Sequence, residues 1–470
     1  MNVHMCQGCF EKMRKLDRLE AEVRRLQQEN RQLKEMLGRK NRTINEEPFG
    51  SSTPSSKRPV KASSAEEDRR KRGGAKAGHV GNGRQRLDAE LTGAAVRVTV
   101  PDCCPDCGTE LDGKGIVERS VLDLEPEKLQ PRRYDLERCA CPNCGRTVRA
   151  KAPGVLPKAL YGNMLLAKVA EEHYLHGHTL GDIATRLGIN NGSLFNALHQ
   201  LAGTLEPVAT RLVEDFRQAP VKHADETPWR TDGVNGYAWL FSTRDTSVFR
   251  LRETRAATVP EEVFGKQALP GVLVVDRYAA YNRVPCSIQY CYAHLMRDVE
   301  DLEKEFHDDR EVVAFTNALI PLLAKAMKLR AEATDPRKHR RRALRLKEKI
   351  VAICAKSARH AGIQQIQGIF REKAERLYHW AESPNIPADN NFAERDLRGL
   401  VIARKISFGS QSEQGRRTRE VLMTILHTLK KRGRDPARSL KTALDLLAGN
   451  SQADLGQEIF PSPPKPAHLP

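Results

Sequence analysis

Two Cys-x-x-Cys-Gly motifs constrain the fold of this chain more than any other feature. The first pairs Cys104 with Cys107, and the second pairs Cys141 with Cys144. The glycine after each motif permits the tight turn that brings both thiolates onto one metal ion. Two such turns supply the closed tetrahedral Cys₄ set of structural zinc. The sequence therefore predicts one structural Zn²⁺ held by these four cysteines.

The segment that separates the two motifs favours a zinc ribbon over residues 96–152. Between Cys107 and Cys141 lie 33 residues, which is longer than the usual 15 to 20 or so. Within this gap, 116–124 and 134–138 have the composition of short strands. Cys103 and Cys139 are close enough in sequence to substitute as ligands, and a redox dithiol is the alternative to zinc.

The N-terminal segment, residues 1–40, is predicted to be a coiled-coil zipper. Leucine recurs at d positions and a single asparagine, Asn30, occupies an a position, which favours a parallel two-stranded register. We therefore expect a homo-oligomer, at least a dimer; the alternative is an amphipathic helix that packs on its own chain. Cys6 and Cys9 form a third, isolated pair. One interpretation is that they bind a zinc ion shared across the dimer.

Charge points to a polyanionic partner. The 470 residues contain 78 Lys and Arg against 60 Asp and Glu, a net charge of +18, and this favours DNA. No apolar run of membrane-spanning length and no signal peptide is visible, so we expect a cytoplasmic, nucleoid-associated protein without a membrane. In that compartment paired cysteines favour metal over disulfides. Residues 41–95 read as a basic flexible linker, either solvated or in nonspecific contact with DNA phosphates.

Residues 156–215 are predicted to be helical and to include a helix-turn-helix. In 179–198, Ala184 is small where two helices would cross, and Gly188 suits the turn. The second helix, from about Ser193, would present Asn196 and His199 to DNA. The alternative is an ordinary helical hairpin.

From residue 216 the pattern changes to short strands. The expected order is three strands, a helix, a buried strand, a further strand and a late helix, which is the order of an RNase H-like α/β core. The fold class is thus multidomain α+β, with this core at 216–410, a helical insertion at about 300–380, a basic helical region at 411–452 and a disordered tail at 453–470. The expected strands are 221–224, 236–242, 247–252, 271–275 and 288–292, with helices at 258–264, from 294 and from about 390.

Three acids in these elements are candidate ligands for catalytic metal. Asp225 closes the first expected strand, Asp276 closes the buried strand, and Glu394 lies on the late helix. Two Asp and one Glu can hold a pair of Mg²⁺ or Mn²⁺ ions, because these metals prefer oxygen ligands. Each acid alone has an ordinary explanation as a turn cap or a surface ion pair.

Neighbouring side chains supply support and competition for these acids. Asn390 and Asn391 open the late helix, and Arg398, one turn after Glu394, is placed to orient its carboxylate. Glu226 and Asp389 are substitute ligands, whereas Asp396 points about 200° away round the helix. Near the last strand a second metal site is an alternative to buried cysteines and a hydrogen-bonded histidine; its candidates are Cys286, Cys291 and His294.

These residues resemble the transposases of the insertion sequence 66 family, the large catalytic proteins of that bacterial mobile element. The resemblance covers most of the chain. It depends on the zipper, both zinc motifs, Gly73-Gly-Ala-Lys-Ala-Gly78-His79-Val-Gly81, Ala224-Asp225-Glu226-Thr227, Asp276-Arg-Tyr-Ala-Ala-Tyr281, Cys291-Tyr-Ala-His294, Asn390-Asn391-Phe-Ala-Glu394-Arg395-Asp-Leu-Arg398 and Phe408-Gly409-Ser410.

The resemblance implies that Asp225, Asp276 and Glu394 form a DDE triad. It implies Mg²⁺-dependent nicking at the ends of an insertion sequence and transfer of the 3′-hydroxyl ends into target DNA. The expected partners are the terminal repeats, target DNA and accessory proteins of the same element. Two other readings stay open: a non-enzymatic, zinc-containing DNA-binding regulator, and an RNase H-like nuclease that cuts without joining.

Overall fold

The computed structural model describes residues 22–23, 25, 95–125, 128–329 and 335–461. Clustering of contacts divides the chain into two compact units, Met1–Arg58 and Pro59–Pro470. The expected linker and nearly all of the expected zipper, including Cys6 and Cys9, lie outside the described residues.

The Cys-rich segment forms a small sheet of its own. Its strands are β1 (Val96–Val98), β2 (Asp112–Glu125), β3 (Lys128–Ala140) and β4 (Thr147–Arg149). β3 pairs antiparallel with β2 and β4 and parallel with β1. The two strands expected between the cysteine motifs are therefore present, and both are longer than the sequence indicated. A separate hydrophobic core lies beneath them and includes Val121, Tyr134 and Leu136.

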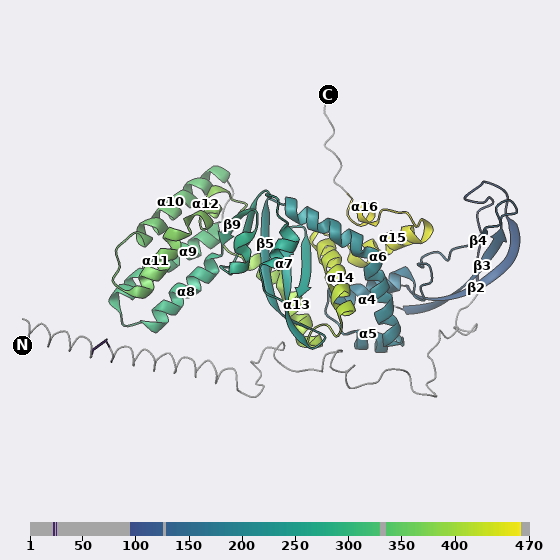
Figure 1. Cartoon of the computed structure of the whole chain (residues 1–470), viewed down its shortest axis with the longest axis horizontal. Helices are drawn as coiled ribbons and strands as arrows, with labels where there is room; N and C mark the ends of the chain where they lie inside the picture. Colours follow the sequence, from purple (N-terminus) through teal and green to yellow (C-terminus); the bar gives the residue numbers. More distant parts are fainter. Residues whose placement is uncertain (1–21, 24, 26–94, 126–127, 330–334, 462–470) are drawn as a thin grey trace, which may run out of the picture. The chain divides into compact units, whose positions relative to one another are not determined.

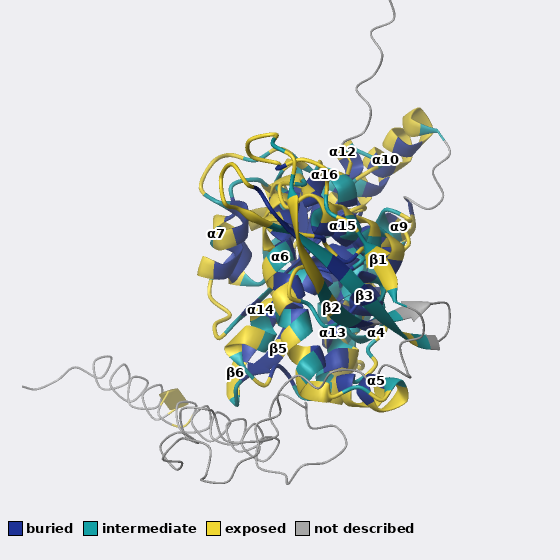
Figure 2. Cartoon of the chain, turned by 90° about the vertical axis from the view of Figure 1, so that its right-hand side faces the viewer, coloured by how far each residue is buried: buried dark blue, intermediate teal, exposed yellow. Residues whose placement is uncertain are grey.

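Three helices follow this sheet, and a short turn joins the last two. They are α4 (Asn163–Tyr174), α5 (Leu180–Leu187) and α6 (Asn191–Gln218). α5 ends at Gly188, whose left-handed conformation (φ 63°) permits the sharp turn into α6. Side chains of Thr179 and Asn190 accept from the backbone N–H groups of Asp182 and Ser193 and so cap the two helices. The outer surface of α5 is exposed (Figure 2).

The central sheet has five strands in the order β7-β6-β5-β8-β9. β5 (Val221–Thr231), β6 (Val234–Ser242) and β7 (Ser247–Arg252) are antiparallel neighbours. β8 (Val272–Val275) runs parallel to β5, and β9 (Ser287–Tyr290) runs parallel to β8. All four residues of β8, Val-Leu-Val-Val, are buried, as expected for a parallel strand covered on both faces. α7 (Thr258–Phe264) precedes β8.

The expected helical insertion follows β9 and lies beyond the β9 edge of the central sheet (Figure 1), and its core is continuous with the sheet face that carries Trp239 and Phe241. Its helices are α8 (Tyr292–Glu305), α9 (Arg310–Leu329), α10 (Pro336–Cys354), α11 (Ala361–Glu372) and α12 (His379–Glu382). By length and composition alone, α9 could cross a membrane. However, Val312, Leu319 and Leu323 of α9 are fully buried in the core of the insertion, as in a core helix of a soluble protein.

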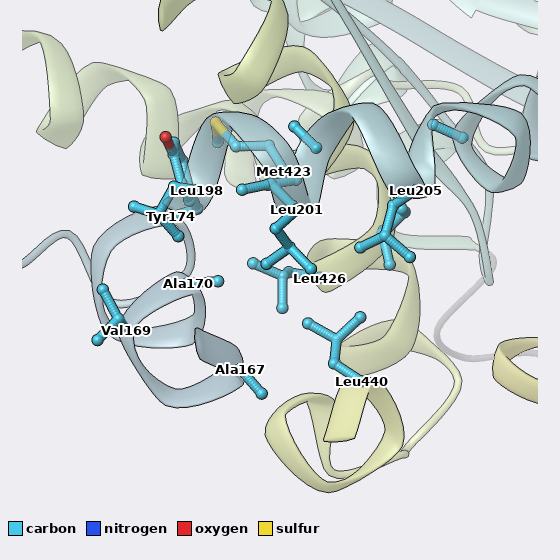
Figure 3. Close-up of a cluster of buried hydrophobic side chains, with 14 of the residues drawn as sticks. Ala167, Val169, Ala170, Tyr174, Leu198, Leu201, Leu205, Met423, Leu426 and Leu440 are labelled. Carbon is cyan, nitrogen blue, oxygen red and sulfur yellow. The ribbon is translucent and has the colours of Figure 1, made fainter. Parts of the chain in front are cut away.

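Four further helices, together with α4 to α6, cover the other face. They are α13 (Asn391–Ser407), α14 (Glu413–Lys431), α15 (Pro436–Gly449) and α16 (Leu455–Ile459). In Figure 3, leucines of α6 meet residues of α4, α14 and α15 in one cluster. The same core includes Trp229 and Leu240 of the sheet. The hydrophobic core thus continues across the expected boundary at residue 215.

The expectation of a disordered tail from residue 453 is wrong for its first part. α16 forms within it, and Ile459 and Phe460 are buried at 0% and 5% exposure. Asp454 caps this helix by accepting from the backbone N–H of Gln457. The prolines that suggested disorder begin at Pro461, after these contacts have been made.

Candidate functional site

The two cysteine motifs adopt the same local structure. In each, the backbone carbonyl of the first cysteine accepts from the backbone N–H of the glycine that follows the motif. Gly108 donates to Cys104 and Gly145 to Cys141, both at 2.9 Å. Both glycines have positive φ, 71° and 68°, which other residues adopt only with strain. An ion pair between Arg146 and Asp106 joins one turn to the other.

These turns bring the four thiols together as the sequence predicts. The Sγ atoms of Cys104, Cys107, Cys141 and Cys144 all lie within 4.8 Å of one another. Sγ–Sγ distances of 3.4 Å (Cys107–Cys141) and 3.7 Å (Cys104–Cys144) are close to the edge of a tetrahedron with Zn–S bonds of about 2.3 Å. Hydrogen bonds, chiefly with Thr109, lower the pKa of the Cys107 thiol to about 6. The pKa of the Cys144 thiol is raised to about 11, against a backbone hydrogen bond with Arg146, by its hydrogen bonds with Cys141 and Cys104. The donor set therefore fits one zinc ion.

The spare cysteines are not part of this group. Cys103 is exposed and Cys139 is buried in β3, and neither belongs to the cluster of four thiols. Over the residues that the structure describes, the Cys₄ set is the one group of three or more potential ligands gathered this tightly.

Asp225 lies within β5 rather than at its end. We expected the strand to stop at Ala224, but it continues to Thr231 because residues 223–231 all pair with β6. The parallel pairing of β5 with β8 nevertheless stops at His223. Asp225 therefore stands just beyond the edge of the parallel part of the sheet. It is paired with Leu240, whose side chain lies in the core beneath α13 and α14, so both project to that face.

Asp276 is level with Asp225 on the neighbouring strand. In the register of β5 and β8, His223 pairs with Val274, and two further residues on each strand lead to Asp225 and Asp276. Asp276 follows β8 directly, and its Oδ1 accepts from the backbone N–H of Tyr278 at 2.9 Å. This turn cap leaves the other carboxylate oxygen for another partner.

Glu394 reaches the same site from α13. The helix begins at Asn391, and the side chain of the preceding Asn390 donates to the carbonyl of Ala224 at 2.8 Å. Glu394 is one turn further along, which places its carboxylate beside β5. Its ion-pair partner is Arg297 of α8, at 4.0 Å. The expected partner Arg398 is exposed and makes no ion pair among the described residues.

The charges of the three acids act on one another. Burial, together with the negative charges of Glu226, Asp276 and Glu394, raises the pKa of the Asp225 carboxyl to about 7 against a hydrogen bond from the backbone of Glu226. Mutual repulsion of this kind is what a divalent cation relieves. The structure thus brings the three predicted acids within electrostatic reach of one another, although they are not gathered as tightly as the four thiols.

The competing acids are engaged elsewhere. Glu226 projects to the opposite face of β5, where its side chain, 3% exposed, accepts from Arg255 at 2.8 Å and from the hydroxyl of Tyr281. Asp389 accepts from the backbone N–H of Asn391. Asp396 accepts from the Ser242 hydroxyl and pairs with Lys431, in agreement with its expected direction.

Hydrogen bonds of Asn390 link β5, the insertion and α13. One of its partners, His223, was not among the candidate residues identified from the sequence. Asn390 is 2% exposed, and its Oδ1 meets Nδ1 of the buried His223 at 2.9 Å. Its backbone N–H donates to the sulfur of Cys291 at 3.2 Å. The His-x-Asp spacing of His223 and Asp225, which puts both side chains on one face of a strand, was the available signal.

The alternative second metal site is not assembled. Cys291 is buried, and its sulfur accepts from Asn390; burial raises the pKa of its thiol to about 11. Burial likewise raises the pKa of the Cys286 thiol, which lies near Lys222. These residues and His294 do not form a cluster of potential ligands within the described structure.

The predicted DNA-contacting residues occupy the first turns of α6. Asn196 is exposed, Ser193 is half-buried, and His199 is also half-buried, because its Nδ1 meets the hydroxyl of Thr418 at 2.7 Å. Leu194 and Leu198 are fully buried, whereas Leu187 and Ile189 are only partly buried. Of the three candidates, Asn196 is thus the one directed fully to solvent.

The fold and these sites define a multidomain α+β protein with a Cys₄ cluster and a group of acids at the edge of a mixed sheet. The family model described as "Transposase IS66 family" matches residues 158–418. The chain therefore belongs to the IS66 family of transposases, which confirms the resemblance read from the sequence.

Two relatives from Sinorhizobium fredii align with most of the chain. The uncharacterized protein y4qI is 27% identical over 406 residues, which are 77% of this chain and 73% of the relative. The uncharacterized protein y4jD is 23% identical over 392 residues, which are 74% and 75% of the two chains. A shorter match, 39% identical over 61 residues, joins 13% of this chain to the uncharacterized protein y4jO of the same organism.

Proposed function

We propose that this transposase is a DDE enzyme in which Asp225, Asp276 and Glu394 hold two Mg²⁺ ions. The observation that carries the proposal is the convergence of these acids, which are distant in sequence, on one edge of the central sheet with mutual repulsion of their charges. The strand order β7-β6-β5-β8-β9, with three antiparallel strands and two parallel ones, supports an RNase H-like core. α8 to α12 would be its helical insertion.

The residues present fit a magnesium site. All three ligands supply carboxylate oxygen, which Mg²⁺ and Mn²⁺ prefer, and the Cys₄ set supplies the sulfur that suits zinc instead. When bound, the paired ions would stabilise the attacking and leaving oxygens of a phosphodiester. Burial and neighbouring negative charges raise the pKa of the Asp225 carboxyl. A metal cation would therefore displace the proton of this carboxyl on binding.

The other residues of the site would position these ligands. The hydrogen bonds of Asn390 to His223 and Ala224 hold the start of α13 against β5, so that Glu394 faces Asp225. Arg297 neutralises part of the charge of Glu394 and restricts its rotation. Glu226, locked by Arg255 and Tyr281, adds a fixed negative charge behind the site.

The proposed reaction has two phosphoryl transfers. In the first, the oxygen of water bonds to phosphorus at the element end, the bond to the 3′-oxygen breaks, and that oxygen leaves as a hydroxyl. In the second, this 3′-hydroxyl bonds to a phosphorus of target DNA and displaces the 3′-oxygen there. Each transfer forms one P–O bond and breaks one, so no covalent enzyme intermediate and no redox partner is required.

The remaining elements would hold DNA. The zinc ribbon, the helix-turn-helix with Asn196 at its surface, and the basic linker are candidate contacts to terminal repeats and target DNA. Self-association through the zipper would bring two ends together, with accessory proteins of the same element as further partners. Such a protein would work in the bacterial cytoplasm, at the nucleoid.

Strand transfer with purified protein tests this function. Protein, DNA with the ends of the element and Mg²⁺ should yield joined 3′ ends. Asp225→Asn should remove both cutting and joining but retain DNA binding. Asp301→Asn, which changes an exposed acid of α8, should remain active. Binding without cutting by the wild type, with accessory proteins supplied, would favour the regulator; cutting without joining would favour the nuclease.

A further inference from the structure

A cavity of about 280 Å³ lies between the helix-turn-helix and the start of α14. We call it the α5–α14 pocket. It is separate from the acids: Ile406, on its wall, is 12 residues beyond Glu394 on α13, or about 18 Å at 1.5 Å per residue. Lining residues used below are His173, Leu180, Phe195, Ile406, Ser412 and Arg419.

The pocket contains a buried cation without a counter-charge. Arg419 is 5% exposed, and within the described structure its guanidinium makes no ion pair with a carboxylate. Its Cζ atom lies 5.1 Å from the ring centres of both Tyr174 and Trp229, which gives it two cation–π contacts. Among the described residues its N–H groups have two hydrogen-bond partners: the sulfur of Met423 at 4.0 Å and Nε2 of His173 at 3.3 Å. A guanidinium has five N–H donors, so Arg419 retains donors for a ligand in the pocket that it lines.

The histidine beside Arg419 does not supply the missing charge. Burial and the neighbouring guanidinium lower the pKa of His173 to about 3, so the ring is neutral. Its Nδ1 meets the carbonyl of His178 at 2.7 Å, which requires the proton to be on Nδ1. Nε2 is then an acceptor that orients Arg419 without neutralising it. A buried, uncompensated cation costs stability, and a bound anion would offset that cost.

Two helix N-termini also border the pocket. Thr179 and Leu180 open α5, and Ser412 caps α14. Helix N-termini carry partial positive charge and favour anions such as phosphate. They add to the charge of Arg419 from two directions.

The remaining walls are apolar and open. Phe195 and Ile406 are large hydrophobic residues at 42% and 43% exposure, and Leu180 is buried between them and the core. An exposed aromatic ring beside a cationic site suits a ligand that combines an anion with a flat ring. The volume is near the lower end of ligand pockets, which begin at about 300 Å³.

We propose that the α5–α14 pocket binds one unpaired nucleotide of DNA, with the phosphate toward Arg419 and the base against Phe195. The inference deepens the proposed function, since membership of a transposase family is what favours a nucleotide over an acidic peptide. The pocket would then hold a base displaced from the duplex at the element end or beside the cut.

Fluorescence anisotropy in buffer without Mg²⁺ or Mn²⁺, which leaves the structural zinc in place, tests the pocket apart from catalysis. The probes are a labelled duplex with a one-nucleotide bulge and the same duplex fully paired. The wild type should bind the bulged probe at least about fivefold more tightly, because a stacked base contributes measurably to affinity. Phe195→Ala and Arg419→Met should remove this preference. Leu446→Ala, at a 45% exposed residue of α15 outside the pocket, is the matched control and should retain it.

Thermal denaturation separates a binding role of Arg419 from a structural one. Arg419→Met replaces an uncompensated cation by an apolar chain of similar length, so its Tm should equal or exceed that of the wild type. If its Tm falls, the binding preference of Phe195→Ala tests the pocket instead, because that variant alters only an exposed ring. Equal affinity of the wild type for both probes, or a retained preference in Phe195→Ala, would overturn the proposal. Asp225→Asn should retain the preference for the bulged probe. The binding assay therefore tests the pocket independently of the proposed catalytic role of Asp225.

Discussion

Removing the charge of Asp225 should stabilise the metal-free protein at neutral and alkaline pH. The carboxyl has an ordinary pKa of 3.8, and burial with neighbouring negative charge raises it to about 7 in the folded protein. Between these values the folded state holds a proton that the unfolded state has released. Stability therefore falls as pH rises from about 4 to about 7 and then stays constant.

The magnitude follows from the size of this shift. One unit of pKa corresponds to about 1.4 kcal/mol, so a shift of about three units sets a ceiling of about 4 kcal/mol. Asp225 is only half-buried, and solvent screening and relaxation reduce the effect to about 1–2 kcal/mol. Asp225→Asn keeps the shape of the side chain and removes the charge, so it should recover this free energy above pH 7.

Thermal denaturation in EDTA at pH 5 and pH 8 measures this gain. We expect Asp225→Asn to exceed the wild type by a few degrees at pH 8 and by much less at pH 5. Millimolar Mg²⁺ should raise the Tm of the wild type at pH 8 and that of the variant much less, because the cation removes the same repulsion. A variant that is less stable than the wild type in EDTA at pH 8, or a difference that is independent of pH, would refute the reasoning.

Three other predictions concern zinc, α13 and α10. Elemental analysis should find one zinc per chain in the wild type and none in Cys141→Ser, and a chelator should lower the Tm of the wild type alone. Asn390→Ala should lower the free energy of unfolding in denaturant by about 2–3 kcal/mol, because buried partners lose their hydrogen bonds. Asn391→Ala removes a side chain that is only half-buried and should lower it much less. Equal losses would contradict the assigned role of Asn390. Three exposed arginines of α10 are Arg337, Arg341 and Arg345. Replacing them with glutamate should reduce the slope of log affinity against log salt concentration, measured with random duplex DNA, by up to about three phosphate contacts. An unchanged slope would exclude this helix from the interface.

Local features of this fold could be predicted from the sequence. The cysteine turns follow from spacing and glycine, because a Cys-x-x-Cys-Gly segment has few conformations that direct both thiols to one point. β7 and α7 begin and end where the residue pattern indicates. The two helices joined at Gly188 could also be predicted, since the turn and the buried Leu194 and Leu198 depend on neighbours in sequence.

Features that depend on distant residues could not be predicted. β5 continues past Ala224 because β6 provides a pairing partner for seven further residues, Asp225–Thr231, and no local signal marks that length. Arg398 is one turn from Glu394 in sequence, but Arg297 of another helix forms the ion pair. The tail is ordered to Phe460 by apolar contacts with helices far earlier in the chain. In each case tertiary packing overrides the local pattern.

Anomalous diffraction from crystals of the protein with end DNA and Mn²⁺ tests the central claim most directly. We expect two manganese peaks among the carboxylates of Asp225, Asp276 and Glu394, and zinc at the Cys₄ cluster. Manganese bound elsewhere, or an ordered site in which Glu394 keeps its pairing with Arg297 and contacts no metal, would contradict it.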